Sequence, residues 1–282
     1  MKTISKVFSC ILAFSSLLGS VEGQNRYKIW YDKPASYWEE ALPIGNGRIA
    51  AMVFGDPQLE QIQLNEETVS AGSPYQNYNE EAKAALPEMR RLIFEGKYEE
   101  AQNMAATKIL SQVGNEMPYQ TVGRLNIRYQ DHKKVSNYYR DLDISNAVAV
   151  TRYEVDGVEF TEETFASFTD QLVIRHIKSS KPGAINCELF FNTPMRDPKR
   201  SIYGKKGLRL EGITHGSRYF PGKVHYCADL DVKNKGGEVT MANDTLLSVQ
   251  GASELTLYIS MATNFVNYKD ISGDPYQRNK TY

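Results

Sequence analysis

Cysteine and histidine are scarce in this sequence, and their scarcity excludes several kinds of site. The 282 residues include three cysteines and four histidines. The histidines do not stand at the HExxH or HxH spacing of metal-binding motifs, so we expect no metal site. The sequence also lacks the P-loop, the dinucleotide-binding fingerprint and the G-x-S-x-G serine nucleophile motif. No cofactor is therefore expected.

An excess of one charge is also missing, which argues against a nucleic-acid partner. The formal net charge is −1 at pH 7, and the lysines and arginines are scattered along the chain. Nucleic-acid binding usually requires a clustered basic face. The two basic pairs, Lys199-Arg200 and Lys205-Lys206, are expected to lie in a solvated loop that contains glycine.

An apolar run at the N-terminus is too short to cross a membrane. Lys2 and Lys6 come before an apolar stretch at 7–18, and small residues at 20–23 follow that stretch. This order is typical of a cleavable signal peptide, whereas a membrane span needs about 20 apolar residues. We predict that residues 1–23 are removed by a cut near Gly23, which leaves a secreted or periplasmic protein with no membrane partner.

The two cysteines of the mature chain are expected to be free thiols. Cys187 shares an apolar strand face with Ile185 and Leu189, whereas Cys227 alternates with polar residues such as Asp229. A disulfide requires that both Cβ atoms point toward each other. The two faces do not meet that requirement.

Helical spacing of apolar residues appears in one long segment of the chain. Across 79–112 these residues recur at helical spacing on either side of Gly96-Lys97, which predicts two helices in a helical hairpin. Pro87 is expected to shift the start of the first helix to Ala84 or Ala85. Near the C-terminus, Asp274-Pro275 predicts an N-cap and the first residue of a short helix.

Most of the remaining sequence alternates with the period of two that is typical of half-buried strands. Asp156-Gly157, Gly236-Gly237 and Asn243-Asp244 supply two-residue turns. Many short strands separated by turns predict a mainly β protein, a large antiparallel sandwich with the helical hairpin inserted at about 79–112. The expected strands lie at 24–32, 49–54, 60–64, 123–129, 139–144, 147–155, 158–168, 171–178, 184–191, 208–212, 224–232, 238–241, 245–249 and 254–261.

Residues 38–72 carry the most specific motif in the chain. Trp38 precedes ALPIGNGR at 41–48, MVFG at 52–55 and IQLNE at 62–66. This order resembles the opening of the N-terminal domain of glycoside hydrolase family 95, the α-L-fucosidases. Segments at 119–129, 165–175 and 251–265 resemble later strands of the same domain, and 272–275 resembles the G-D-P that begins its linker.

The resemblance implies an architecture and an activity for a longer protein. Family 95 enzymes have an N-terminal β-supersandwich, a helical linker, an (α/α)₆ barrel and a C-terminal β domain, and they hydrolyse terminal α-L-fucose with inversion. Their catalytic Glu, and the Asn and Asp that activate water, lie in the barrel, and no position of this sequence matches them. We therefore interpret 24–268 as a non-catalytic supersandwich domain and 269–282 as the start of a truncated linker. The implied partners are the C-terminal barrel and, through the parent enzyme, a fucosylated glycan.

Residues of the opening segment are candidates for the rim of a sugar pocket or for a domain interface: Trp38, Asn46, Arg48, Asn65 and Glu66. The last four lie at turn or strand ends, where loops commonly carry function. A structural explanation, which we favour, is that Asn46 adopts a left-handed turn and Arg48 forms an ion pair with Glu66. Trp38 is a possible sugar platform, but such aromatics more often fill cores or interdomain contacts; the same holds for Trp30.

Adjacent acidic residues are not expected to be catalytic. Inverting glycosidases place two carboxyl groups about 6.5–9.5 Å apart around one substrate. Glu162 and Glu163 lie on a predicted strand, where neighbouring side chains point to opposite faces. The pairs at 39–40, 66–67, 80–81 and 99–100 are also interpreted as structural or solvated residues. No catalytic residue is assigned.

Two other functions remain open at this point. A stand-alone carbohydrate-binding module would need aromatic side chains in line on one solvated sheet face. A mutarotase-like epimerase would need a histidine acid opposite a carboxylate base, and four scattered histidines fit that chemistry poorly. Similarity of fold alone cannot decide between them.

Overall fold

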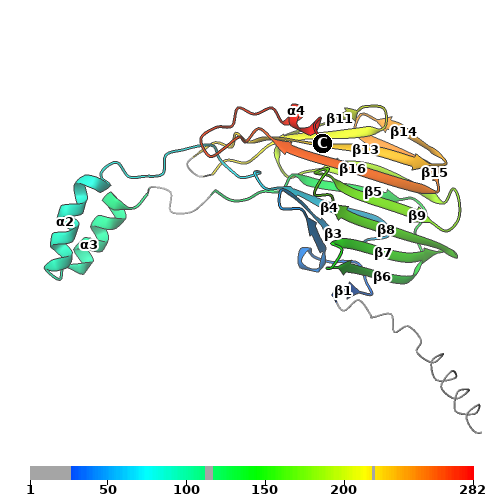
Figure 1. Cartoon of the computed structure of the whole chain (residues 1–282), viewed down its shortest axis with the longest axis horizontal. Helices are drawn as coiled ribbons and strands as arrows, with labels where there is room; N and C mark the ends of the chain where they lie inside the picture. The colour runs from blue at the N-terminus through cyan, green and yellow to red at the C-terminus, as the bar shows by residue number, and fades with distance from the viewer. Residues whose placement is uncertain (1–26, 112–116, 218–219) are drawn as a thin grey trace, which may run out of the picture.

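Alternating apolar and polar residues build strands that pair into two antiparallel sheets, and one helical hairpin projects from them (Figure 1). A computed structural model describes residues 27–111, 117–217 and 220–282. The predicted signal peptide at 1–23 lies outside the described residues. Among those described, no helix has both the length and the apolar composition that crossing a membrane requires.

The larger sheet has nine strands in the order β1-β6-β7-β8-β9-β16-β13-β12-β11. Its neighbours are antiparallel throughout, and β6 to β9 follow one another as a meander. The strands are β1 Lys28–Tyr31, β6 Val135–Asp143, β7 Val148–Val155, β8 Val158–Ala166, β9 Val173–Ser179, β11 Arg196–Tyr203, β12 Gly207–Ile213, β13 His225–Lys235 and β16 Glu254–Thr263.

The smaller sheet has seven strands in the order β14-β15-β10-β5-β4-β3-β2. Its pairs are also antiparallel, and the opening segment supplies three neighbouring strands at one edge. The strands are β2 Leu42–Gly45, β3 Ile49–Val53, β4 Leu59–Glu66, β5 Gly123–Tyr129, β10 Ile185–Asn192, β14 Glu238–Asn243 and β15 Leu246–Ala252.

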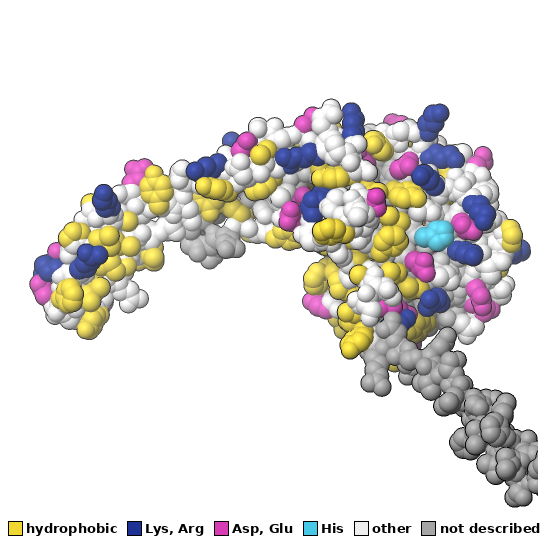
Figure 2. Space-filling model, viewed as in Figure 1, with side chains coloured by type: hydrophobic (Ala, Val, Ile, Leu, Met, Phe, Trp, Pro, Cys, Tyr) yellow, Lys and Arg dark blue, Asp and Glu magenta, His cyan; other side chains and the backbone are white. Residues whose placement is uncertain are grey.

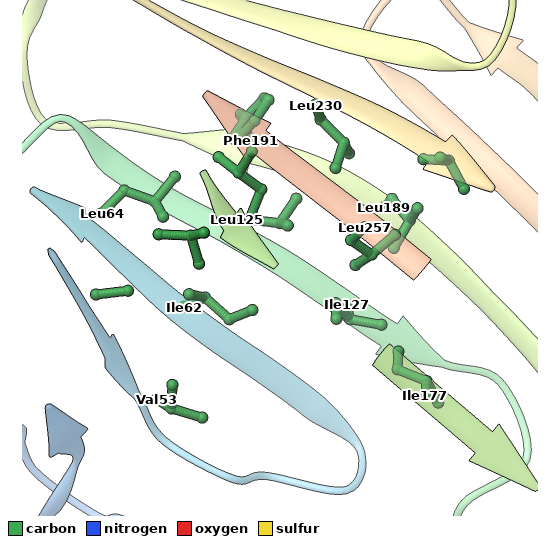
Figure 3. Close-up of a cluster of buried hydrophobic side chains, with 14 of the residues drawn as sticks. Val53, Ile62, Leu64, Leu125, Ile127, Ile177, Leu189, Phe191, Leu230 and Leu257 are labelled. Carbon is green, nitrogen blue, oxygen red and sulfur yellow. The ribbon is translucent and has the colours of Figure 1, made fainter. Parts of the chain in front are cut away.

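The core fills the space between the sheets. Ile62 and Leu189 from the smaller sheet, and Ile177 and Leu257 from the larger one, are fully buried and point toward one another (Figure 3). Each such side chain contributes about 1.5–3 kcal/mol of burial free energy. Because the side-chain period of a strand is two, polar residues between these positions face outward. The predicted mainly β sandwich is confirmed.

Two strands were not predicted from the sequence, and both lie at the edge of a sheet. β2 contains Pro43 and Gly45, and β11 contains Pro198 between charged residues, so neither shows apolar alternation. The expected solvated loop around Lys199-Arg200 is therefore wrong, because this pair lies in β11 opposite Glu211 and Leu210 of β12. Edge position explains the polar composition.

The predicted turns have different outcomes. Asp156-Gly157 joins β7 to β8 with φ of 49° and 80°, as a two-residue hairpin turn requires. Gly236-Gly237 was expected to form a hairpin, which is wrong, because it connects β13 to β14 in different sheets. The β14–β15 turn lies one residue later than predicted, since Asn243 still pairs with Leu246.

The predicted helical hairpin is confirmed as α2 (Ala82–Phe94) and α3 (Tyr98–Met104), which continues into the π-helical turn η2 (Ala105–Ile109). The predicted start is wrong, because α2 begins at Ala82 and Pro87 lies inside it. Pro87 is exposed, so water can satisfy the carbonyl that loses its partner. Hydrophobic side chains gather on this arm (Figure 2), and Phe94 is 89% exposed.

The short helix near the C-terminus has the predicted cap. Asp274 accepts hydrogen bonds from the backbone of Tyr276 and Gln277, and Pro275 is the first residue of α4 (Pro275–Asn279). The helix packs on β13 and β16 of the larger sheet. Its buried Asn279 donates to the carbonyl of Cys227 at 3.1 Å. Cys187 and Cys227 are free, as predicted, and both are buried.

Candidate functional site

The β2–β3 turn connects the smaller sheet to the larger one through Asn46. Its Oδ1 accepts from the backbone of Arg48 and Ile49 at 3.1 and 3.0 Å, and its Nδ2 donates to the Ser167 carbonyl at 2.8 Å. The left-handed residue of the turn is Gly47, with φ of 96°. The expectation that Asn46 itself adopts this conformation is therefore wrong; its side chain closes the turn instead.

Arg48 lies in the turn between β2 and β3, and its guanidinium contacts segments that are far apart in the sequence. It donates to the Gln171 side chain at 2.7 Å, the Gln171 carbonyl at 3.1 Å and the Met261 carbonyl at 2.7 Å. Its side chain is 19% exposed. On the other side, the Tyr282 ring lies 4.3 Å from the guanidinium carbon. Arg48 therefore positions a loop, a strand end and the C-terminal segment.

Glu66 completes this group and forms the predicted ion pair with Arg48 at 3.6 Å. The carboxylate accepts from the amide and hydroxyl of Thr68 at 2.8 and 2.6 Å, and the Thr68 hydroxyl also contacts that of Thr263. Burial raises the pKa of the Glu66 carboxyl. We call Asn46, Arg48, Glu66, Thr68 and Gln171 the rim cluster.

The other two predicted residues lie apart from this group. Asn65 is half-buried opposite Ala50, and its side chain points to the outer face of β4 because neighbours on a strand alternate. Trp38 lies in the 3₁₀ turn η1 (Trp38–Glu40) before β2, whereas the Asn46 turn follows that strand. At 49% exposure Trp38 does not fill the core, and Trp30 at 61% does not either.

An apolar groove of about 640 Å³ adjoins the rim cluster at Thr68. Aromatic side chains line it, including Tyr75 and Phe265, with the hydroxyl of Ser70 among them. Tyr75 stacks on Phe220 with ring centroids 4.3 Å apart. The groove and the rim cluster together form a half-open surface that offers hydroxyls, one ion pair and aromatic faces.

A second polar cluster lies inside the sandwich and is sealed from solvent. Arg175 of β9 binds Glu60 of β4 at 3.0 Å and also contacts Glu162 of β8. Tyr129 and Tyr153 donate to Glu162 at 2.5 and 2.7 Å. These charged side chains are at most 1% exposed. We call these five residues the sealed cluster.

Glu60 has unusual chemistry because it shares one cation with a second carboxylate. It accepts from the backbone of Phe54 and Gly55 at 3.1 and 3.0 Å. Burial nevertheless raises the pKa of its carboxyl to about 7, against the opposing effect of Arg175. No substrate can reach this group, so the sealed cluster braces the two sheets and does not form a catalytic pair.

The other acidic and histidine side chains of the described residues do not form a second catalytic or metal-binding site. Glu162 is buried and Glu163 is exposed, so the prediction that they face opposite ways is confirmed. His132 stacks on Tyr129 with centroids 4.3 Å apart, and His176 bonds to Thr256 at 3.0 Å. Within the described ranges, no three His, Cys, Asp or Glu side chains converge as metal ligands would.

Two residues of the rim cluster, Gln171 and Thr68, were not among the predicted site residues. Gln171 adopts a left-handed φ of 59° and supplies two acceptors to Arg48. Thr68 and Thr263 come from distant parts of the chain and meet only after the sheets pack. Polar residues just after strand ends were the available signal, but they do not indicate which loops meet.

Comparison with known proteins identifies the domain. Residues 29–268 match the family described as glycosyl hydrolase family 65, N-terminal domain. The chain belongs to this family. The predicted resemblance to a glycoside hydrolase N-terminal domain is thereby confirmed.

The curated relatives of this family 65-type domain are fucosidases. "Alpha-L-fucosidase 2" of Arabidopsis thaliana is 32% identical over 84% of this chain and 30% of its own length. "Probable alpha-fucosidase A" of Aspergillus niger is 27% identical over 54% of this chain and 20% of its own length. A solved structure, "Putative kojibiose phosphorylase from human microbiome", superposes with a TM-score of 0.47 at 9% identity, over 90% of this chain and 34% of that one. The chain thus spans less than a third of the length of these two fucosidases.

Proposed function

We propose that this chain is the non-catalytic N-terminal domain of a secreted α-L-fucosidase of family 95. The parent enzyme would hydrolyse terminal α-L-fucose of a fucosylated glycan with inversion. The observation that carries this proposal is the match to an α-L-fucosidase over 84% of this chain but only 30% of the relative. The motifs at 38–72 support the same assignment.

The chemistry of the described residues supports placing catalysis outside this domain. Inverting hydrolysis needs an acid and a base that reach one sugar from opposite sides, about 6.5–9.5 Å apart. The most perturbed carboxyl, Glu60, lies beside Glu162 within the sealed cluster. We assign the catalytic groups to the C-terminal (α/α)₆ barrel that the resemblance to family 95 implies.

The rim cluster and its groove are the proposed contact surface for that barrel. The Tyr282 ring lies against Arg48, so the segment after α4 borders this surface. Exposed aromatic side chains lie close by in the sequence, with Phe168 and Tyr268 each 74% exposed. Large apolar side chains that face solvent often mark an interface. Trp38 and Asn65 lie apart from the rim cluster, so in this proposal they are separate interface contacts and do not extend its surface.

An activity assay tests the assignment. The chain alone should release no nitrophenol from 4-nitrophenyl α-L-fucoside, whereas a polypeptide extended by the coding sequence after Tyr282 should hydrolyse it. Proton NMR of the first product should show the inverted β-anomer. Turnover by the chain alone, or an extended polypeptide with no fucosidase activity, would contradict the proposal.

Export is tested separately. The protein recovered outside the cytoplasm should begin at or near Gln24, because the predicted cut lies near Gly23. N-terminal sequencing measures this directly. A mature protein that keeps residues 1–23 would remove the secretion part of the proposal and leave the fucosidase part standing.

A further inference from the structure

The outer face of the smaller sheet carries an array of polar side chains. α4 packs on β13 and β16, which belong to the larger sheet, so the smaller sheet presents its outer face on the opposite side of the sandwich. Because strand neighbours alternate, Gln63 of β4, Arg124 of β5 and Asn192 of β10 point outward. Register places them in one row, with Gln63 opposite Arg124 and Arg124 opposite Asn192.

This row forms one wall of a shallow hollow of about 300 Å³. Arg124 donates to the Gln61 side chain at 2.7 Å, and its guanidinium lies 5.7 Å from the centre of the Phe54 ring. No carboxylate of the described residues lies within ion-pair distance of Arg124. Gln63 contributes a buried Oε1 without a hydrogen-bond partner in the described structure. The hollow therefore contains a cation with no carboxylate partner, beside a buried amide oxygen that no described group satisfies.

A second hollow of about 320 Å³ lies further along β10. Phe190 lines it and stands two residues before Asn192 on the same face of β10. Arg200 reaches it from edge strand β11, and its buried Nε has no acceptor among the described residues. Arg128, in contrast, is paired with Glu188 at 3.1 Å. Asn192 lines the first hollow and Phe190 the second, so neighbouring positions on one face of β10 link them, and we call the pair the polar groove. Arg124 lines the first hollow and Arg200 the second, and neither forms an ion pair with a described carboxylate.

We propose that this groove binds an acidic oligosaccharide that contains uronate residues. A guanidinium matches a planar carboxylate through two parallel hydrogen bonds, and Arg124 and Arg200 supply two such groups. The side-chain amides of Gln63 and Asn192 can donate to and accept from sugar hydroxyls. An open groove lined by polar side chains fits an extended, hydroxylated chain. This binding site does not depend on the proposed fucosidase function.

Calorimetric titration of the full chain tests the site, with trigalacturonate as the probe and maltotriose as its neutral counterpart. Trigalacturonate should bind, and added salt should weaken it. Arg124→Gln should raise the Kd at least tenfold, since it removes the charge that meets the carboxylate. The matched control Arg152→Gln lies on β7 of the other sheet, 48% exposed, and should leave the Kd unchanged.

Different results would contradict the binding site and its assignment to uronate. Equal binding of both sugars, no heat at millimolar trigalacturonate, or an unchanged Kd in Arg124→Gln would each contradict it. Tighter binding of a sulfated trisaccharide would contradict the assignment to uronate. If Arg124→Gln lowers the melting temperature, Arg200→Gln repeats the test in the second hollow, with the same tenfold loss expected.

Discussion

Two glutamates on the inner face of β4 have different roles at the two ends of that strand. Glu60 and Glu66 are six residues apart on one strand face, and each pairs with an arginine. The Glu60 pair with Arg175 is fully buried, and Arg175 also holds Glu162. The Glu66 pair with Arg48 is longer, at 3.6 Å, and the arginine remains 19% exposed.

The two arginines differ in the groups that they bind. Arg175 binds side chains of both sheets, so it joins them and has no contact outside the core. Arg48 binds the Gln171 loop, the end of β16 at Met261 and the ring of Tyr282. The sealed pair therefore stabilises the sandwich, and the rim pair positions the surface proposed to meet the barrel.

Removal of the sealed cation should have the largest effect. Arg175→Ala leaves Glu60 and Glu162 buried without a cation, which should lower the free energy of unfolding by about 3–5 kcal/mol. Urea denaturation at pH 7 measures the change. Lys235→Ala, which removes the exposed partner of Glu254, itself 29% exposed, serves as the control and should cost less than about 1 kcal/mol. Equal losses would erase the distinction between sealed and surface pairs.

The second-largest effect is a dependence of the free energy of unfolding on pH, which we assign to Glu60. Burial raises its pKa from 4.5 to about 7 although Arg175 opposes the shift, so the folded state binds this proton more tightly than the unfolded state. The stabilisation is fully present below the unfolded pKa and is lost as pH rises through 7, at about 1.4 kcal/mol per unit. Glu60→Gln keeps an acceptor but removes the titration.

Urea denaturation at pH 5, 6 and 7 measures that dependence. Between pH 5 and 7 the wild type should lose about 2 kcal/mol more than Glu60→Gln. Glu66→Gln is the matched rim control and should change the slope less, since its carboxyl is less buried. Parallel pH profiles for wild type and Glu60→Gln would be inconsistent with a raised pKa at this site.

Loss of the rim arginine should cost less than loss of the sealed one. Arg48→Ala removes three hydrogen bonds at a partly exposed position, so we expect about 2 kcal/mol from chemical denaturation. Arg48→Lys should recover part of this, because lysine restores a donor but not the planar fork. A loss as large as that of Arg175→Ala would show that the rim also holds the sheets together.

The smallest effect is expected at Trp38. Its side chain is 49% exposed at a turn outside the core, so Trp38→Ala should change the free energy of unfolding by no more than about 0.5 kcal/mol. Thermal denaturation checks this in the chain. A loss above 2 kcal/mol would mean that Trp38 packs as a structural residue.

Much of the fold followed from the sequence because period-two alternation reports half-buried strands directly. β5 begins and ends where predicted, and the Asp274 cap of α4 was identified from two residues. β2 and β11 were missed because edge strands have only one neighbour and tolerate proline and charge. The Gly236-Gly237 error arose because two glycines specify a turn but not which sheet follows it.

The site was predictable only where its parts lie close in sequence. The Arg48–Glu66 pair follows from the β3–β4 hairpin, since Ile49 lies opposite Glu66. The contacts to Gln171, Met261 and Tyr282 span more than 100 residues and depend on how the sheets pack. The sealed cluster was missed for the same reason, because Glu60 and Arg175 each looked like an ordinary charged residue on a strand.

Hydrogen exchange of Arg48→Ala against wild type tests most directly the claim that the rim arginine positions loops and does not hold the sheets. We predict faster exchange confined to 167–172 and 264–282, with the amides of β4, β9 and β16 unchanged. Arg175→Ala should instead accelerate exchange across both sheets. Uniform acceleration in Arg48→Ala, or no change at 264–282, would contradict the division between the rim cluster and the sealed cluster.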